Sequence, residues 1–190
     1  MKKIIIAITL ILGAQLTISA QENRTGYGQH LVSFQPIAIV NDNIGVGLTY
    51  ENFFHKNVSL KIPVMYGLNN TNYAAGGIGL KFYPSGHNKT VTYAIGPEIY
   101  LGYGKKEFTT FIWDQATQRN IQVIENQTQS HFGFRLNNSL NITISKAIYL
   151  GMDLGLGINY IDKTKTTTTN NTYTSTSFAG QFGISIGYRF

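Results

Sequence analysis

The sequence predicts an all-β fold, an eight-stranded antiparallel up-and-down transmembrane β-barrel. From about residue 30 onward, apolar residues alternate with polar or small ones at a period of two, which is typical of strands with two unlike faces. The alternation falls into eight segments, an even number, joined by connections of unequal length. Charged residues make up only 13% of the chain, about half of the share that is usual in soluble domains.

The first twenty residues are predicted to be a cleaved secretory signal peptide. A basic start is followed by an apolar run from Ile4 to Leu12, and Ser19-Ala20 ends the stretch in small residues. A membrane-anchoring helix is the weaker alternative, because the run is shorter than the roughly 20 residues that span a bilayer. We therefore assign residues 1–20 to the signal peptide and residues 21–190 to one barrel domain. The chain has no cysteine, which excludes disulfides, thiolate metal sites and a lipid-anchored cysteine.

The first four strands are expected over 30–40, 44–54, 58–67 and 76–84. The strand over 30–40 is the least regular, because Pro36 cannot donate a hydrogen bond to a neighbouring strand. In the other three, the apolar residues occupy even-numbered positions, opposite polar residues and glycines. Each of these three segments therefore predicts a strand with one apolar and one polar face.

The last four strands are expected over 90–103, 131–143, 148–160 and 178–190. Apolar residues occupy odd positions in the first of them and even positions in the other three. The clearest alternation begins at Ile148, where seven successive even positions are apolar through Tyr160. The connections after the second, fourth and sixth strands are short, and the longest ones follow the odd strands. If both chain ends lie in the periplasm, this matches short periplasmic turns and longer outer loops, apart from a short first loop.

Two of the long connections contain further strand-forming residues. Residues 108–113 and 121–124 flank a polar turn over 114–120, which predicts that the fifth and sixth strands continue above the membrane as a hairpin. Residues 164–177 would extend the last hairpin in the same way, with a turn at Asn170-Asn171. Solvated loops are the alternative for both segments.

The polar faces carry about one charged residue per strand, and the charges nearly balance. These residues are Glu51, Lys61, Lys81, Glu98, Arg135, Asp153 and Arg189. Because a single ion is costly to bury, such a set suits a closed lumen in which charges pair, and we interpret it as a structural polar network. Glycines on the same faces would leave room for long side chains in a narrow barrel. A soluble lipocalin-type cup with its apolar face inside is the alternative, but its outer surface would carry far more charge.

Aromatic residues of the apolar faces fall near both ends of the predicted strands, as expected of a lipid-facing surface. The chain ends in Ile186-Gly187-Tyr188-Arg189-Phe190. This ending resembles the assembly signal of the outer-membrane β-barrel family, in which Tyr188 and Phe190 would be read by the barrel-assembly machinery. The resemblance covers about residues 28–190 and is nearest in shape to the small OmpA- and OmpX-like barrels. The end of the signal peptide and the composition also resemble small barrels of Bacteroidota.

That resemblance implies export to the outer membrane, with residues 21–190 forming the outer-membrane β-barrel domain. The expected surroundings are outer-membrane lipid and lipopolysaccharide, the barrel-assembly machinery is the expected partner during biogenesis, and the expected state is a monomer. Nucleic acid is not an expected partner, since the longest basic run is Lys105-Lys106.

No catalytic residue, cofactor motif or metal-ligand spacing is predicted. His131 beside Ser130 is the only candidate for a nucleophile and its base, and neighbouring side chains on a strand point to opposite faces. Inward Tyr83, Tyr100 and Tyr149, with two of the arginines, would fill the lumen of so small a barrel. Two alternatives to a barrel with a structural or surface-interaction role stay open: a small-solute pore and a lipid A-modifying enzyme.

The expected function is envelope-structural or surface-interacting. The outer hairpins over 104–130 and 161–177 would carry the interaction, with an extracellular protein or glycan as the possible partner, because unpaired strand edges are suited to strand addition.

Overall fold

The computed structural model describes residues 27–68, 72–114, 118–166 and 172–190. The predicted signal peptide and the turn predicted at Asn170-Asn171 lie outside the described residues. Eight strands make up most of the described chain, and no helix in it is long and apolar enough to cross a bilayer. The strands are β1 (His30–Val40), β2 (Asn43–His55), β3 (Val58–Gly67), β4 (Ala74–Phe82), β5 (Val91–Asp114), β6 (Arg119–Thr143), β7 (Ile148–Thr166) and β8 (Thr172–Arg189).

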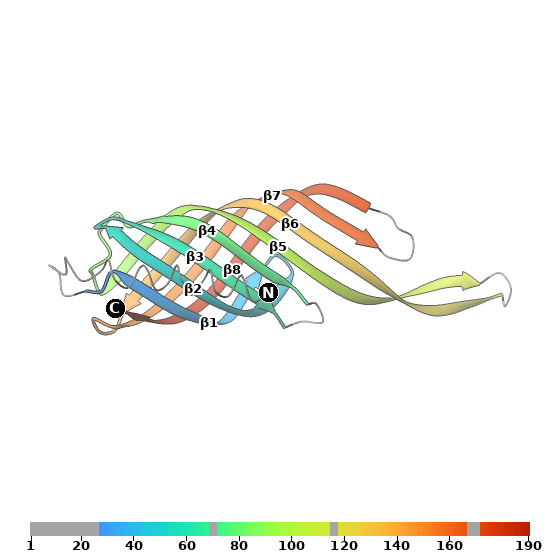
Figure 1. Ribbon diagram of the computed structural model, residues 1–190, viewed down its shortest axis with the longest axis horizontal. Coiled ribbons are helices and arrows are strands. Elements are labelled where there is room, and N and C mark those ends of the chain that lie inside the picture. The colour runs from blue at the N-terminus through green and yellow to red at the C-terminus, as the bar shows by residue number, and fades with distance from the viewer. Residues whose placement is uncertain (1–26, 69–71, 115–117, 167–171) are drawn as a thin grey trace, which may run out of the picture.

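The strands close into a barrel in which each one pairs antiparallel with its neighbours in sequence (Figure 1). Closure is made between β1 and β8, whose register places Leu31 opposite Arg189 and Val40 opposite Gln181. The backbone amide of His30 also donates to the carbonyl of Phe190 at 2.9 Å, so the last residue belongs to the ring. The predicted eight-stranded antiparallel barrel is confirmed.

The two ends of the barrel differ in how far the strands run beyond it (Figure 1). The terminal end, as we name it, holds His30, Phe190 and the short connections that follow β2, β4 and β6. At the opposite end, the hairpin end, β5 and β6 continue together as a long two-stranded ribbon, and β7 and β8 form a shorter extension. β5 and β6 contain 24 and 25 residues, against 9 to 13 in β1–β4.

Pro36 lies within β1, as predicted, and is accommodated at a bulge. The register between β1 and β2 shifts between Gln35 and Ala38, and that between β1 and β8 shifts between Phe34 and Ile37. A bulge leaves a residue without ladder partners, which is where a proline costs least. The less regular first strand therefore forms without a hydrogen bond from Pro36.

The apolar face of every strand points outward and the polar face points inward. Leu48, Leu101, Leu154 and Ile186 have exposed fractions of 53%, 61%, 45% and 50%, whereas the charged residues of the opposite faces are buried. An apolar surface that encircles the whole barrel is far larger than the patches soluble monomers expose. The exterior therefore requires hydrocarbon around it, and the soluble-cup alternative is excluded.

Aromatic side chains flank this apolar belt at both ends. Exposed at the hairpin end are Tyr66, Tyr103, Phe132, Tyr160 and Phe178, and at the terminal end Phe54, Phe82, Tyr188 and Phe190. Such girdles are characteristic of barrels that span a membrane, where aromatic rings lie at the level of the lipid headgroups.

Candidate functional site

The middle of the lumen holds a continuous chain of six buried charges of alternating sign. Glu51 pairs with Lys81 at 3.3 Å, and Lys81 pairs with Asp153 at 3.4 Å. Asp153 also pairs with Lys61 at 3.2 Å, and Lys61 lies 3.8 Å from Glu98. Glu98 in turn binds the guanidinium of Arg135, whose Nε donates to it at 3.0 Å. Six of the seven residues predicted for the lumen network are thus brought into one chain from six different strands.

Neutral side chains add hydrogen bonds to the three carboxylates. Ser59 and Tyr83 each donate to Glu51 at 2.5 Å, and Asn137 donates to Glu98 at 2.5 Å. Ser139 donates to Asp153. Buried charges are stable only when their remaining lone pairs are satisfied in this way, so the charged and neutral side chains form one connected network.

Small residues make the network possible. Gly79 lies directly between Lys61 on β3 and Glu98 on β5 in the register. A Cβ at position 79 would lie 3.0 Å from the Cβ of Glu98 and 2.9 Å from the carbonyl oxygen of Pro97. Lys61 and Glu98 can approach each other across β4 because position 79 has no side chain.

Two apolar layers enclose the charged middle. Toward the hairpin end, Tyr73, Tyr100 and Met65 pack with three small residues of β1 and β8. Toward the terminal end, Tyr83, Tyr149 and Phe53 pack with Leu31 and Ala94. Tyr100 also lies against Arg135, whose guanidinium carbon is 4.1 Å from the ring centroid. A cavity beside Arg135 and Gln35 has a volume of only about 10 Å³, space for about one water, so side chains fill the lumen at this level.

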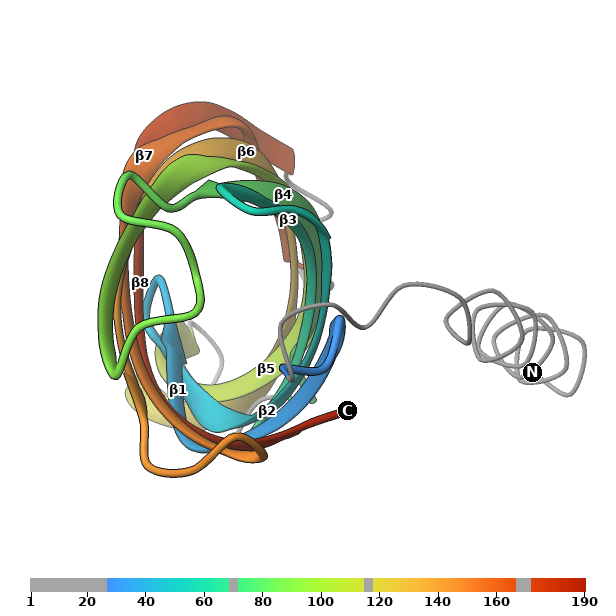
Figure 2. The same cartoon turned by 90° about the vertical axis from the view of Figure 1, so that its left-hand side faces the viewer.

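Arg189 is buried like the other six residues but lies outside their chain. Its Nε donates to the carbonyl of Gly28 at 2.6 Å, and its Nη1 donates to the carbonyl of His87 at 3.1 Å. The guanidinium carbon lies 4.2 Å from the centroid of Phe53. Arg189 therefore ties the last strand to the β4–β5 connection, which folds over the terminal end of the barrel (Figure 2).

His87 in that connection forms part of the closure. Its ring lies 4.5 Å from the ring of Phe53, and its Nδ1 accepts a hydrogen bond from Arg189 at 2.6 Å. Burial, together with the positive charge of Arg189, lowers the pKa of His87 to about 4. The imidazole is therefore neutral at pH 7, which is the form that can accept from a guanidinium.

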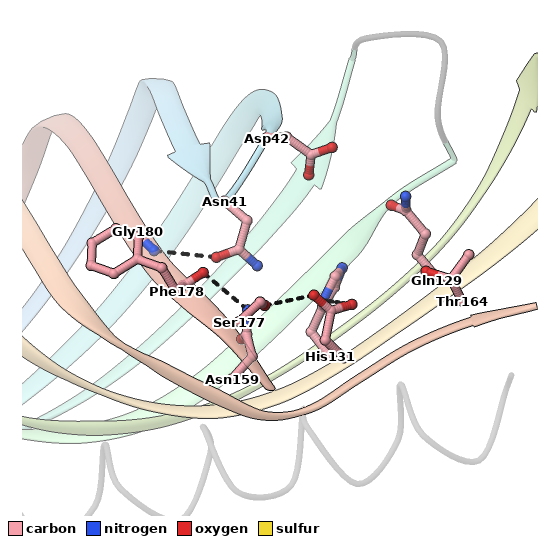
Figure 3. Close-up of a pocket in the computed structure, with 10 residues that line it drawn as sticks. Asn41, Asp42, Gln129, His131, Asn159, Thr164, Ser177, Phe178 and Gly180 are labelled. Atoms are coloured by element: carbon pink, nitrogen blue, oxygen red, sulfur yellow. Dashed lines mark hydrogen bonds and ion pairs between the residues drawn. The ribbon is translucent and has the colours of Figure 1, made fainter. Parts of the chain in front are cut away.

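The mouth at the hairpin end contains a polar pocket of about 400 Å³ (Figure 3). Ser177 donates to Asp162 at 2.6 Å, and Asp162 lies 3.3 Å from Nδ1 of His131. Asn159 donates to Ser177 at 2.9 Å, and the side chain of Asn41 accepts from the amide of Gly180 at 3.3 Å. The floor of this pocket is the tyrosine layer, since the hydroxyl of Tyr100 contacts Asn159.

The histidine and serine considered as a catalytic pair are not arranged as one. His131 is buried on the inward side, and Ser130 lies on the outward row between Tyr103 and Lys163. The serine that does approach is Ser177, but its partner is Asp162 and not the imidazole. A nucleophilic serine requires the imidazole between it and the carboxylate. Within the described ranges, no group of three or more histidine, aspartate or glutamate side chains could hold a metal ion.

Sequence reasoning missed Tyr73, which falls between the strands predicted over 58–67 and 76–84. Tyr73 is fully buried at the hairpin end of the lumen, over two glycines of β5. A Cβ at Gly102 would lie 2.1 Å from the Tyr73 hydroxyl, and one at Gly104 would lie 2.8 Å from its ring. The spacing of these two glycines on one strand face was the available signal for an aromatic side chain lying across them.

Comparison with solved structures shows the same fold in bacterial outer-membrane proteins. A major outer membrane protein of Thermus thermophilus superposes with a TM-score of 0.58 and 12% identity, over 85% of this chain and 99% of that one. OprG of Pseudomonas aeruginosa gives a TM-score of 0.58 and 12% identity, over 86% of this chain and 96% of that one. No protein-family profile and no curated protein sequence matches the chain. The chain thus has the fold of the small outer-membrane β-barrels.

Proposed function

From this fold, we propose that the chain is a non-enzymatic integral protein of the outer membrane that contacts a partner outside the cell through the β5–β6 ribbon. The observation that carries the proposal is the contrast between a lumen sealed by side chains and a ribbon that extends far beyond the barrel. The functional surface is then the ribbon, and the barrel is its anchor.

The terminal end faces the periplasm in this proposal. Its connections are short, as periplasmic turns are in outer-membrane barrels. Strands β1, β3 and β4, with 9 to 11 residues, have the length that crosses a bilayer. β5 and β6 run on for another dozen residues, which places the ribbon roughly 35 Å along the strand direction past the girdle residue Tyr103 at about 3.3 Å per residue.

The ribbon presents both free edges and apolar side chains. β5 pairs with β4 as far as Tyr103, and its Lys105 still exchanges backbone hydrogen bonds with Asn72. In the described part of the chain, β6 pairs with β7 as far as Gln127. Among the described residues, the two strands then pair with each other from Lys106 opposite Gln127 through to Asp114 opposite Arg119. Phe111, Trp113 and Ile124 lie on its outward face with exposed fractions of 68%, 58% and 66%. Exposed edges beside large apolar side chains favour a protein partner that adds a strand.

The alternatives are less well supported by the contacts in the lumen. A small-solute pore would need a water path through the ion-pair chain and both tyrosine layers, and the cavity beside Arg135 has space for about one water. A lipid A-modifying enzyme would need a nucleophile held by a base, and the Ser177–Asp162–His131 order does not provide it.

Tyr188 and Phe190 have the exposure that an assembly signal needs. Their rings stack on the outside of the barrel with centroids 6.2 Å apart, while the backbone of Phe190 closes the ring with His30. We propose that the assembly machinery reads these two rings before β8 pairs with β1.

Photocrosslinking on living cells tests the surface role. A photoreactive side chain at Gln122, on the outward face of the ribbon, is expected to form a discrete crosslinked species. The same group at Lys146, in the β6–β7 turn at the terminal end, is expected to form none. Replacing residues 108–125 with an Asn-Gly turn leaves Glu107 opposite Asn126 and should preserve the barrel. This variant should no longer bind a soluble form of the crosslinked partner. Unchanged binding would show that the ribbon is not the binding surface.

Conductance tests the sealed lumen separately. Protein inserted into planar bilayers is expected to give no stepwise current at neutral pH. Regular unitary steps would favour the pore, and lipid A that changes on expression would favour the enzyme.

A further inference from the structure

The register of β5, β6 and β7 places three lysines together on the outside of the barrel, just above the aromatic girdle. Lys105, Thr128 and Lys165 form one row across the three strands, and Tyr103, Ser130 and Lys163 form the next row down. All three lysines are exposed. Neighbouring strands are about 4.8 Å apart, so the Cα atoms of Lys105 and Lys165 are separated by roughly 10 Å, a distance that two lysine side chains span easily.

Charge at the rim is divided between the two faces of β7. Asp162 points inward to Ser177 and His131, while Lys163 and Lys165 point outward. None of the three lysines forms an ion pair with any other described residue. Glu107, one pair further along the ribbon, is the carboxylate nearest to them in the outward rows. The outer rim over β6 is thus a compact cationic patch.

An apolar groove of about 540 Å³ lies directly beneath this patch. Its lining includes Leu101, Phe132 and Ile161, which form the row below Tyr103, Ser130 and Lys163. Ala74 and Gly76 on β4 form its floor, because these two outward positions lack the large side chains of Ile78 and Leu80 further along the strand. The groove opens toward the hydrocarbon in the outer part of the membrane.

We propose that this face binds a lipid of the outer leaflet that carries a phosphate monoester. The three lysines hold the phosphate at headgroup level, Thr128 and Ser130 offer hydroxyls between them, and the groove takes an acyl chain. The patch and the groove together fit an amphiphile, whereas a free anion would use only the lysines. Three lysines whose Cα atoms lie within about 12 Å suit the nearly double negative charge of a monoester better than the single charge of a phosphodiester. The proposal goes beyond the role of the ribbon and rests only on the barrel spanning the outer membrane.

Binding of defined lipids to the full-length mature protein in a nonionic detergent tests it. The probes are lipid A with its phosphate monoesters, the same lipid dephosphorylated, phosphatidylglycerol and inorganic phosphate, each titrated and counted by native mass spectrometry. Tight binding of one lipid A is expected. The variant K105Q/K163Q/K165Q should bind it at least about tenfold more weakly, because each basic residue near a lipid headgroup adds to the attraction for an anionic lipid. E107Q should bind it more tightly.

Matched controls separate the site from general charge and from folding. K56Q/K89Q/K146Q removes the same charge from exposed lysines of the terminal end and should bind as the wild type does. A leucine at Gly76 fills the groove, and its Cβ would meet only Val64 and Pro63 at 3.6 Å and 3.7 Å. Gly76→Leu should therefore weaken lipid binding with no change of charge, while Gly180→Leu, on the outward face of β8, should not. Heat-modifiable gel mobility confirms that each variant is folded.

Three results would overturn the proposal. The first is equal binding of lipid A by the wild type and the triple-lysine variant. The second is equal binding of the dephosphorylated lipid or phosphatidylglycerol. The third is displacement of lipid A by an equal concentration of inorganic phosphate, which would mark an anion site with no lipid specificity. None of these results bears on the ribbon, whose test uses a different readout.

Discussion

Lys61 is the residue on which the lumen network depends most, because it links Asp153 on β7 with Glu98 on β5. Its side chain is about 1% exposed. Without it, Glu98 keeps Arg135 and Asp153 keeps Lys81, but the chain of alternating charges is divided and one negative charge is left in excess. The cost of a buried charge without its partner is the main energetic term at this site.

Replacing this lysine by a side chain of similar length tests that statement. Lys61→Met is expected to destabilise the barrel by about 3–5 kcal/mol, as removal of one partner from a buried ion pair typically does. Lys146→Met, an exposed control, should change stability by less than about 0.5 kcal/mol. Urea titrations in lipid vesicles, read by heat-modifiable mobility, give both values. Equal stability of the two variants would show that the lumen charges are not coupled.

His87 makes the terminal end sensitive to acid. Its pKa is lowered to about 4 by burial and by Arg189, against about 6.5 in an unfolded chain. Between these values the unfolded chain binds more protons, so the stability that His87 contributes is present above pH 6.5 and is lost as the pH falls toward 4. The mid-temperature of unfolding should therefore fall less between pH 7.5 and 4.5 in His87→Gln than in the wild type. His55→Gln, at the exposed end of β2, is the control, and the same slope in all three proteins would contradict the role of His87.

At the scale of the strand, alternation places one face in lipid and the other in the lumen. Leu154 and Ile184 lie on the lipid face of β7 and β8, near the middle of the belt. An arginine there must enter the hydrocarbon, because the lumen side of the strand is already occupied. The outward face of the ribbon beyond the belt has no such restriction.

Arginine substitutions along one face measure where the lipid begins and ends. Leu154→Arg and Ile184→Arg should each cost about 2–4 kcal/mol of folding free energy in bilayers. Gln122→Arg, on the outward face of the ribbon, should cost nothing measurable. Vesicle-based refolding titrations make the comparison, and normal folding of the two belt variants would show that this face does not meet lipid.

Much of the strand pattern could be predicted from period two, since each β-strand repeats its environment at every second residue. What period two cannot locate is a bulge. The register between β6 and β7 shifts next to Phe132, so both Tyr160 and Ile161 are exposed, although they are neighbours in sequence. The bulge at Pro36 was not predicted either. One inserted residue moves every later side chain of the strand to the opposite face, and the period alone does not show where this happens.

Which charges pair across the lumen could not be predicted from one sequence. Alternation indicates that Lys81 and Asp153 point inward, but these residues belong to strands on different sides of the barrel. Their meeting depends on the stagger of all eight strands, which local patterns do not encode. Arg189 points inward like the other six residues, but it lies near the terminal end of the barrel. It therefore bonds to Gly28 and His87 there and not to the ion-pair chain.

At the scale of the molecule, the barrel combines a lipid-facing exterior with an interior of paired ions between two tyrosine layers. The arrangement is the reverse of a soluble barrel. The ribbon and the cationic rim are both consequences of strands that continue past the membrane while keeping their two faces.

A photoactivated carbene generated within the hydrocarbon core tests this orientation directly. The carbene labels any residue that contacts lipid, and the experiment requires no substitution. Mass spectrometry of the labelled native protein in vesicles then gives the extent of labelling at each residue of β7. Labelling is expected at Leu150, Met152, Leu154 and Leu156, with none at the inward positions between them. Labelling without alternation, or at the inward positions, would contradict the account.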